Sequence, residues 1–397
     1  MLIEQYIFIT IFFSVFIFFI YIHIAYPFWV HMPVSHTYDL HHRLRFLYNN
    51  LPIQILQQHP YKNKWNSKEV KTVSYYDLSE GTKEQILDQL NCNYIPSDSI
   101  LFAIEKKHLD TLFSGHFNTP YISFFTPLTE NQKIKGCISS YPIHILYRQE
   151  NQTQKISSNY IAYLACDKDV TVHKDVSRKL IATHEYNCPE LRTSIMKKHV
   201  GKCSGVKPLL EFSTRLFYIS LLNQKKNANP FTTLVPTQVY KENWSTISDI
   251  LELLPLFFDF CAYIDVGALK ARVDAGQLWI FCLKSQGEIL AVYFIEDSLT
   301  LYENVNKYGG KMLTLTASIC NMKKDSGREF AIGFADCLAL IQKQNRDYTM
   351  LLMDDVGHNR LITKGTRGEI VKTDGAYYFI NCFMEKPINR GRVFMLF

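Results

Sequence analysis

The chain has 397 residues and a formal net charge of +6, and 47% of its residues are hydrophobic while 20% are charged. This length is too great for one small core, and this balance excludes an intrinsically disordered chain. The basic excess is mild and dispersed, so we expect no nucleic-acid partner. The ten cysteines form no Cys-x-x-Cys pair, so we expect reduced structural thiols and no metal site.

An apolar segment covers residues 7–25, with the sequence IFITIFFSVFIFFIYIHIA and no charged residue. At ~1.5 Å per residue, about 19 helical residues cross most of a ~30 Å hydrocarbon core. Aromatic residues bracket the segment as they do at membrane interfaces: Tyr6, Tyr21, Tyr26 and Trp29. A cleaved signal peptide would need a basic start, but the first charged residue is Glu4. We therefore predict a retained transmembrane helix over residues 6–27.

The charges that flank this helix predict its orientation. No lysine or arginine precedes it, and several follow it: Arg43, Arg45, Lys62 and Lys64. Basic flanks favour the cytosolic side of a membrane, so we predict a single-pass membrane protein with its body facing the cytosol. Two Asn-x-Ser/Thr triplets, at Asn151 and Asn243, would matter only in a luminal body.

Periodic hydrophobic residues predict the elements of the body in chain order. The first set is a helix over 81–90, strands over 100–104, 121–125, 136–147 and 159–166, and a helix from 176 to about 186. The second set is strands over 278–283, 289–295 and 312–319, a helix over 329–345, and strands over 348–353, 376–383 and 392–397. This order indicates an α/β (α+β) protein with a mixed sheet, built as two lobes that meet near residue 215.

A polar segment, DKDVTVHKD at residues 167–175, follows the fourth strand and precedes a helix. Its basic members are Lys168, His173 and Lys174. The first turn of a helix offers free backbone N–H groups and the positive end of the dipole, which together bind phosphates. The segment therefore suits the pyrophosphate of an acyl-coenzyme A, although a solvated surface loop is the alternative interpretation.

The segment KIKGCISSYPIHILYRQENQTQKISSNYIAYLACDKDV, with VSRKLI after it, resembles the central part of eukaryotic N-myristoyltransferases. That family has a Gly-Phe-Ile-Ser-x-x-Pro strand, a hairpin, a second strand with a Phe-Leu pair, and a basic loop that enters a helix. The matching residues are Gly136, Ile138, Ser139 and Pro142 in the first strand, and Tyr163 and Leu164 in the second.

Other segments match the same family in the correct order. FWVHMPV resembles its Phe-Trp-x-Thr-Gln-Pro-Val, LLMDDVGHN its Asp-Leu-Met-Glu-Asn segment, and TDGAYYFINCF its Gly-Asp-Gly segment. The matching residues are Phe28, Trp29, Pro33, Val34, Asp355, Asn359, Asp374, Gly375 and Asn381. The resemblance covers residues 28–397 and leaves out the apolar N-terminal segment.

The resemblance implies two tandem lobes of the GCN5-related acetyltransferase (GNAT) fold, with residues 28–215 binding acyl-coenzyme A and residues 216–397 binding the peptide. It implies transfer of a myristoyl group from myristoyl-coenzyme A to an N-terminal glycine. The family's oxyanion hole is formed by backbone N–H groups, here those of Tyr163 and Leu164, and such donors typically supply about 3 to 4 kcal/mol. The family's base is the terminal carboxylate, here that of Phe397, on an apolar tail that we expect to thread into the core.

The loop and the resemblance together assign the remaining contacts. The residues expected at the acyl-coenzyme A are Phe28, Trp29, Lys168, His173, Lys174, Ser177, Arg178 and Lys179. The residues expected at the peptide are Asp355, Asn359, Asp374 and Gly375. We expect the protein to be a monomer. We also expect no cofactor, because myristoyl-coenzyme A is a co-substrate.

A second hypothesis remains open, in which the chain is a diverged, membrane-anchored acyl-coenzyme A-binding or structural protein with weak or no transferase activity. Three departures from the family pattern support it. His31 and Met32 replace the Thr-Gln of the N-terminal motif, and Asp175 stands where the basic loop of the family has an arginine.

Overall fold

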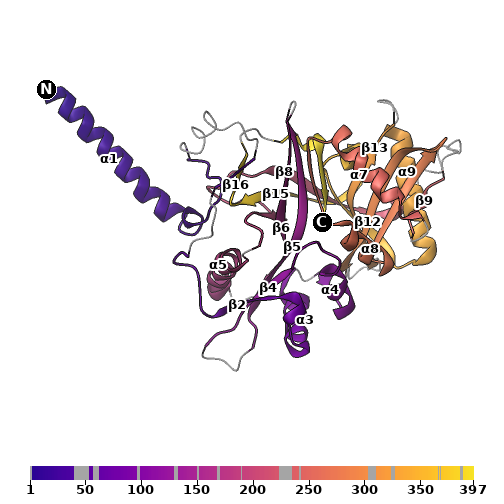
Figure 1. Ribbon diagram of the computed structural model, residues 1–397, viewed down its shortest axis with the longest axis horizontal. Helices are drawn as coiled ribbons and strands as arrows, with labels where there is room; N and C mark the ends of the chain where they lie inside the picture. The colour runs from indigo at the N-terminus through magenta and orange to yellow at the C-terminus, as the bar shows by residue number, and fades with distance from the viewer. Residues whose placement is uncertain are drawn as a thin grey trace.

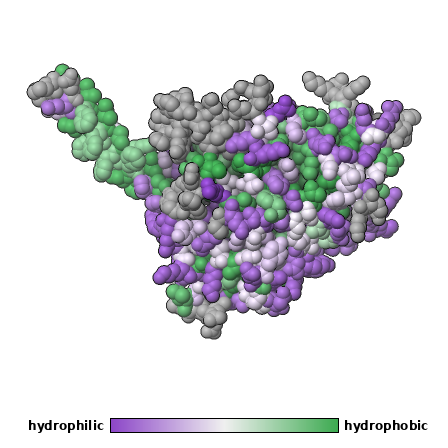
Figure 2. Space-filling view, viewed as in Figure 1, coloured by the Kyte–Doolittle hydropathy of each residue, from purple (hydrophilic) through white to green (hydrophobic). Residues whose placement is uncertain are grey.

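The computed structural model describes residues 2–39, 53–56, 62–95, 99–128, 133–149, 152–167, 170–188, 190–222, 235–240, 243–302, 310–322, 327–364, 366, 368–384 and 388–397. One long helix, α1 (Leu2–Ala25), extends away from a body of strands and helices (Figure 1). Almost all described side chains of α1 are exposed, and its segment Gln5–Ala25 is long and apolar enough to cross a membrane. Figure 2 shows α1 as hydrophobic beside a body surface where hydrophilic residues are widespread.

One mixed sheet runs through the whole body, and among the described residues it has 15 strands. Its main order is β17-β10-β5-β6-β7-β15-β8-β14-β13-β12-β11-β9, with β2, β3 and β4 attached beside this path. The parallel pairs are β6 with β7, β10 with β17, and β13 with β14, and the other pairs are antiparallel. A separate antiparallel pair joins β1 (Ile53–Ile55) to β16 (Cys382–Met384).

The strands of the main sheet have the following bounds: β2 (Val70–Ser74), β3 (Ile100–Phe102), β4 (Tyr121–Phe125), β5 (Gly136–Gln149), β6 (Gln152–Cys166), β7 (Ser194–Lys198), β8 (Leu210–Tyr218), β9 (Thr237–Gln238), β10 (Phe260–Tyr263), β11 (Leu278–Ser285), β12 (Glu288–Tyr302), β13 (Gly310–Cys320), β14 (Tyr348–Asp354), β15 (Glu369–Ile380) and β17 (Val393–Leu396).

Strands from the two halves of the sequence are interleaved in this sheet. β15 lies between β7 and β8, while β10 pairs with β5 and carries β17 on its other edge. Strands from the C-terminal part of the chain therefore complete the N-terminal part of the sheet. The lobe boundary at residues 215 and 216 stays a prediction, and it falls within β8.

The body helices are α3 (Glu80–Asn93), α4 (Lys106–Leu112), α5 (Val170–Asn187), α7 (Thr246–Phe257), α8 (Val266–Asp274), α9 (Gly327–Gln344) and α10 (Asn359–Lys364). Short 3-10 turns cover Trp29–His31, Tyr75–Asp77 and Arg390–Arg392. α3 begins where the Ser79 hydroxyl accepts the Thr82 N–H, and it buries Ile86 and Leu90. α5 packs against β2, β4 and β5 on the side of the body that carries α1 (Figure 1).

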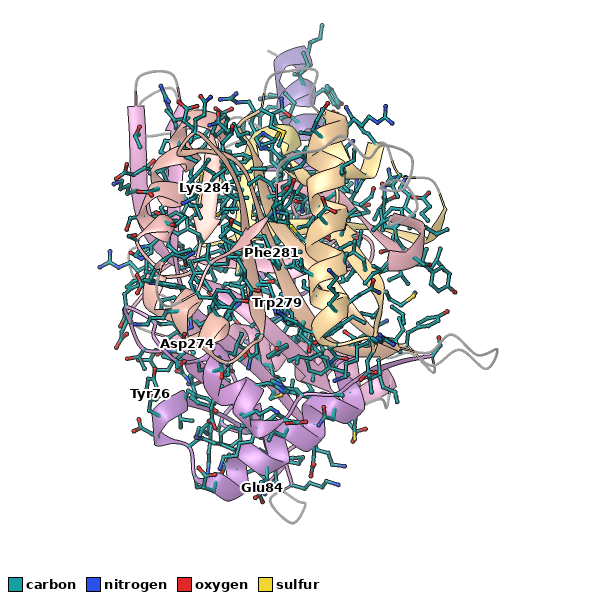
Figure 3. All side chains as sticks on the ribbon, turned by 90° about the vertical axis from the view of Figure 1, so that its right-hand side faces the viewer. Tyr76, Glu84, Asp274, Trp279, Phe281 and Lys284 are labelled. Atoms are coloured by element: carbon teal, nitrogen blue, oxygen red, sulfur yellow. The ribbon has the colours of Figure 1, made fainter. Side chains whose placement is uncertain are left out.

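α9 covers the other end of the sheet. Its apolar residues recur with helical spacing, and Phe330 and Phe334 are completely buried. They pack in one cluster with Trp279 and Phe281 of β11. Figure 3 shows Trp279 and Phe281 near α9, with Lys284 further along the same strand. The mixed α/β sheet fold predicted from the sequence is confirmed.

Three predicted elements start several residues too late, and one of them is β15, which begins at Glu369 and not at 376. α5 begins at Val170 and not at 176, so His173 and Lys174 lie in the helix and not in a loop before it. The β-branched run Val-Thr-Val disfavours a helix by propensity, but the packing of Val176 and Leu180 on the sheet overrides this preference. β6 begins at Gln152 and not at 159, because its pairing with β5 continues to the hairpin.

Candidate active site

The candidate site begins at a β-bulge near the end of β6. The register of β5 on β6 shifts between Ile138 and Ser140, so that Ser139 faces two residues of β6. The Tyr163 N–H donates to the Ser139 hydroxyl, with an N–O distance of 3.3 Å. Bulges redirect backbone groups away from the ladder and are common beside active sites. The two predicted oxyanion donors, Tyr163 and Leu164, therefore lie at an irregular point of the strand.

The parallel strands β6 and β7 stay paired only briefly. Residues 159–161 of β6 pair with residues 194–196 of β7, and β6 then continues to Cys166 without β7 beside it. Backbone groups along such a diverging edge need other partners. The predicted acyl-coenzyme A residue Phe28 is buried in the cluster that contains Ile161, and Leu164 and Trp29 pack against that cluster. The segment that follows α1 therefore packs in the same hydrophobic cluster as residues of β6.

The end of the chain enters the sheet beside β10. Phe397 follows β17, is only 9% exposed, and stacks on Tyr160 with ring centroids 4.1 Å apart. Tyr160 lies on β6 three residues before Tyr163, and at ~3.3 Å per residue this places the two about 10 Å apart along the strand. The apolar tail thus threads into the core as its sequence predicts. The catalytic role of Phe397 stays a prediction.

Two ion pairs hold the segment that leads into β17. Arg392 makes a bidentate contact with Asp259, with Nε–Oδ2 and Nη2–Oδ1 distances of 2.6 and 2.7 Å. Arg390 Nη1 lies 3.3 Å from Asp355 Oδ2. A bidentate guanidinium–carboxylate pair fixes direction as well as distance. The position of Phe397 is therefore set by charged contacts on both sides of the turn before it.

Two residues predicted at the peptide make structural contacts. Asp355 is buried, and its Oδ1 accepts the Ser213 N–H at 2.8 Å while its Oδ2 faces Arg390. Asn359 is 1% exposed, accepts a hydrogen bond from the Ser318 hydroxyl at 2.6 Å, and donates to the Leu315 carbonyl at 3.2 Å. These contacts occupy both side chains in the described structure. Their roles in peptide binding remain predictions.

The other two predicted peptide residues lie together on β15. Asp374 is exposed, and its Oδ1 accepts a hydrogen bond from the Ser213 hydroxyl at 2.6 Å. Gly375 is buried where a Cβ would lie 2.7 Å from the Lys198 carbonyl oxygen and 2.7 Å from the Phe212 ring. Glycine is therefore required there by the close approach of β7 and β8. Only Asp374 presents an exposed side chain at this point.

The basic residues predicted at the acyl-coenzyme A are divided along α5. Lys174 is exposed, and its carbonyl accepts a hydrogen bond from the Ser177 hydroxyl at 3.0 Å. Arg178 lies over the Trp65 ring, whereas Lys179 pairs with Glu69 at 3.1 Å. Lys168 and the side chain of His173 lie outside the described residues. The structure thus places Lys174 and Arg178 on α5 without bringing the whole predicted set together.

The sequence analysis missed a polar cluster on the sheet near Phe397. Lys197 Nζ lies 2.6 Å from Asp354 Oδ2, and the hydroxyls of Thr214 and Tyr377 donate to Asp354 at 2.6 and 3.4 Å. Burial opposes ionisation of Asp354, but Lys197 and Thr214 outweigh it, so the pKa of Asp354 lies below its usual value. Loss of solvation and the charge of Lys197 lower the pKa of His199 to about 4.

Comparisons with known proteins place this geometry in a known fold. No protein-family model matches the sequence, and no curated protein sequence matches it significantly. A Saccharomyces cerevisiae N-myristoyltransferase structure with bound myristoyl-CoA is similar with a TM-score of 0.64 and 13% identity, over 91% of this chain and 93% of that chain. A further structure of that enzyme, with bound myristoyl-CoA and inhibitors, has the same TM-score and identity over 92% and 93%. The chain has the N-myristoyltransferase fold.

Within the N-myristoyltransferase fold, which is an acyltransferase fold, the predicted residues separate into two groups. Phe397 stacks on Tyr160 of β6, the strand that also carries Tyr163 and Leu164, while Phe28 and Trp29 pack in the cluster that contains Ile161 of the same strand. The predicted peptide residues are mostly occupied by contacts within the protein. The cluster around Asp354 lies between these groups, because the Tyr377 ring lies 6.0 Å from that of Phe397.

Proposed function

We propose that the protein is an N-myristoyltransferase-like acyltransferase, which moves a myristoyl group from myristoyl-coenzyme A to the N-terminal glycine of a protein. The observation that carries this proposal is the bulge at Tyr163 on the open end of β6. The Tyr163 N–H there donates to the Ser139 side-chain hydroxyl, within a fold shared with an N-myristoyltransferase. Such groups stabilise an oxyanion in acyl transfer.

The proposed reaction uses no group beyond the protein and its two substrates. The glycine ammonium gives a proton to the Phe397 carboxylate, and the free amine attacks the thioester carbonyl carbon. The Tyr163 N–H exchanges its bond to the Ser139 hydroxyl for a bond to the oxyanion, beside the Leu164 N–H. The C–S bond then breaks, an amide forms, and the leaving thiolate takes the second proton of the nitrogen.

We propose that the acyl-coenzyme A lies across the end of β6, beneath the segment of Phe28 and Trp29. The exposed Lys174 and the neighbouring Ser177 and Arg178 on α5 would face its phosphates. Glycine-terminated peptides would approach over β15, where Asp374 and Gly375 lie. The protein would act as a monomer, held in the membrane by α1 with its body in the cytosol.

One experiment tests the proposal and its alternative. The full chain in detergent is mixed with radiolabelled myristoyl-coenzyme A and a peptide that begins with glycine, with the matched peptide that begins with alanine as control. We expect labelled product from the glycine peptide alone. Binding of the thioester without transfer would refute the enzyme and support an acyl-coenzyme A-binding protein. Absence of binding would refute both.

The binding alternative has a structural argument of its own. Asp355 and Asn359, which the resemblance assigns to the peptide, are buried and hydrogen-bonded within the protein. A chain that retained the fold and lost peptide recognition would keep these residues for stability alone. The same experiment separates the two functions, because only the enzyme gives a labelled peptide.

A further inference from the structure

The C-terminal end of α1 packs against the body of the protein. Ile22 is 3% exposed although its neighbours on α1 are exposed, and the ring centroid of Phe18 lies 6.5 Å from that of Tyr38. From Phe18 to Ala25 the helix rises about 10 Å at ~1.5 Å per residue. The body therefore contacts the helix well inside its apolar segment.

This contact shortens the part of α1 that is free to cross a bilayer. The helix from Leu2 to Ile17 is about 24 Å long at ~1.5 Å per residue, which is less than a ~30 Å hydrocarbon core. A short span is accommodated when flanking residues enter the interface. The side chains around the helix exit must then lie in the headgroup region if α1 crosses the membrane.

The chemistry of those side chains suits that region. The Tyr38 ring stacks on Tyr26 and His36, with centroids 5.8 and 4.8 Å away. The Trp65 indole N–H donates to the Pro27 carbonyl at 3.3 Å, directly after α1. Tyrosine and tryptophan rings are enriched at headgroup level because they have an apolar body and a polar edge.

Two cations lie on the same tryptophan. Lys64 Nζ is 5.4 Å from the Trp65 ring centroid, and the Arg178 guanidinium carbon is 5.1 Å from it. Neither cation makes an ion pair with a carboxylate in the described part of the chain, whereas the adjacent Lys179 pairs with Glu69. Such cations attract anionic lipid when they lie near the surface of a bilayer.

The helix exit is also fixed in orientation. Val34 bridges to Ile380 and His36 bridges to Val206, so the segment after α1 is hydrogen-bonded into the body. Gly205 has a positive φ, and a Cβ there would lie 2.7 Å from the Tyr26 ring. The body therefore cannot pivot freely about Ala25, and a helix that crosses the bilayer always presents the same face to it.

We propose that a collar of Tyr26, His36, Tyr38, Lys64, Trp65 and Arg178 is a docking surface for an anionic lipid bilayer. The collar seats the body on the membrane with the segment of Phe28 and Trp29 in the interface. This proposal does not depend on transferase activity. Its occupant is the lipid surface itself, because the exposed α1 is apolar on all sides and suits lipid.

The chain supplies its own probes for a test. Its four tryptophans are Trp29, Trp65, Trp244 and Trp279. The full chain is reconstituted in phosphatidylcholine vesicles with brominated acyl chains, with or without phosphatidylserine. The double variant Trp244→Phe/Trp279→Phe keeps the tryptophans near the collar, and Trp29→Phe/Trp65→Phe keeps the distant pair. We expect at least about two-fold stronger quenching of the collar pair, increased further by phosphatidylserine.

Charge variants then test the lipid class. Lys64→Glu/Arg178→Glu should remove at least about half of the phosphatidylserine-dependent quenching, and Lys64→Gln/Arg178→Gln should remove less. Lys343→Glu/Arg346→Glu, at the far end of α9, is the matched control and should change nothing. The proposal is overturned if both tryptophan pairs are quenched equally. It is also overturned if the collar pair is not quenched, as when a protein partner covers it, or if the phosphatidylserine-dependent quenching of the charge variants equals that of the parent chain.

Discussion

The tail side of the candidate site, around Phe397, differs from the α5 side in how its polar groups are held. On the tail side Arg392 and Asp259 form a bidentate pair, and Phe397 stacks on Tyr160. On the α5 side Lys174 is exposed. The Arg392–Asp259 pair is itself partly exposed, so its strength depends on its bidentate geometry, while a single exposed charge is weakened by solvent and salt. The tail side is thus held by the burial of Phe397 and by paired charges, whereas the α5 side presents an exposed charge to solvent.

The largest effect is expected at the end of the chain. One alanine added after Phe397 moves the carboxylate by about 3.5 Å, and a misplaced catalytic group can cost about 100-fold in rate. We expect single-turnover transfer to fall by at least that factor while acyl-coenzyme A binding is retained. Phe397→Leu, which keeps the carboxylate and loses the stack on Tyr160, is the control and should fall by less than about 10-fold. Full activity of the extended chain would exclude the carboxylate as base.

A smaller effect, on stability, is expected at Asp355. Asp355→Ala leaves the buried Ser213 N–H without its acceptor and removes the partner of Arg390. We expect the free energy of unfolding to fall by about 2 to 3 kcal/mol, measured with urea. Asp374→Ala, at an exposed neighbouring position, should cost about 1 kcal/mol or less. Equal losses of unfolding free energy in the two variants would show that the contacts of Asp355 with Ser213 and Arg390 stabilise the protein no more than a surface contact does.

The buried His184 of α5 predicts how the stability of the protein depends on pH. His184 is fully buried between the hydroxyls of Ser123 and Ser140, and burial lowers its pKa from 6.5 to about 3. The unfolded chain therefore takes up a proton below about pH 6.5 that the folded protein refuses until about pH 3. The contribution of neutral His184 to the free energy of unfolding is fully present above pH 6.5. It is lost as the pH falls, by up to ~1.4 kcal/mol per pH unit.

The variant His184→Gln isolates this contribution, because glutamine keeps hydrogen-bonding capacity and does not titrate. We expect urea titrations between pH 7 and pH 4 to show a shallower loss of stability in the variant. An identical slope in both proteins would mean that other groups account for the acid sensitivity.

The smallest effect is expected on α5 itself. Lys174→Ala should weaken acyl-coenzyme A binding by about 2- to 5-fold at low salt, and the difference should vanish at high salt because the side chain is exposed. Lys343→Ala on α9 is the matched control. A loss of affinity that does not depend on salt would contradict the interpretation of Lys174 as an exposed, solvent-screened charge.

Segments with long periodic patterns are predictable from the sequence. The helix over 329–345 agrees with α9, which buries one continuous face. The strands β7, β8 and β10 are missed. Their pairing is with strands distant in the sequence, so nothing local identifies them.

The site shows the same limit. The motif around Tyr163 predicts the right strand end, but the bulge depends on the pairing with β5. The motifs at Asp355 and Asn359 predict ligand contacts where the structure has Arg390, Ser213 and Ser318 as partners. The Lys197–Asp354 pair is missed because it joins β7 to β14, which are far apart in the sequence.

The interleaving of β10, β15 and β17 with β5 and β7 has a consequence for how the protein is made. During synthesis, the edges of β5 and β7 stay unpaired until residues 260–263 and 369–380 emerge from the ribosome. Unpaired strand edges are sites of misassembly, and chains of this size fold through intermediates. The two halves should then acquire stability together and late, as one cooperative unit, and a nascent chain stopped before β15 should be a target for chaperones.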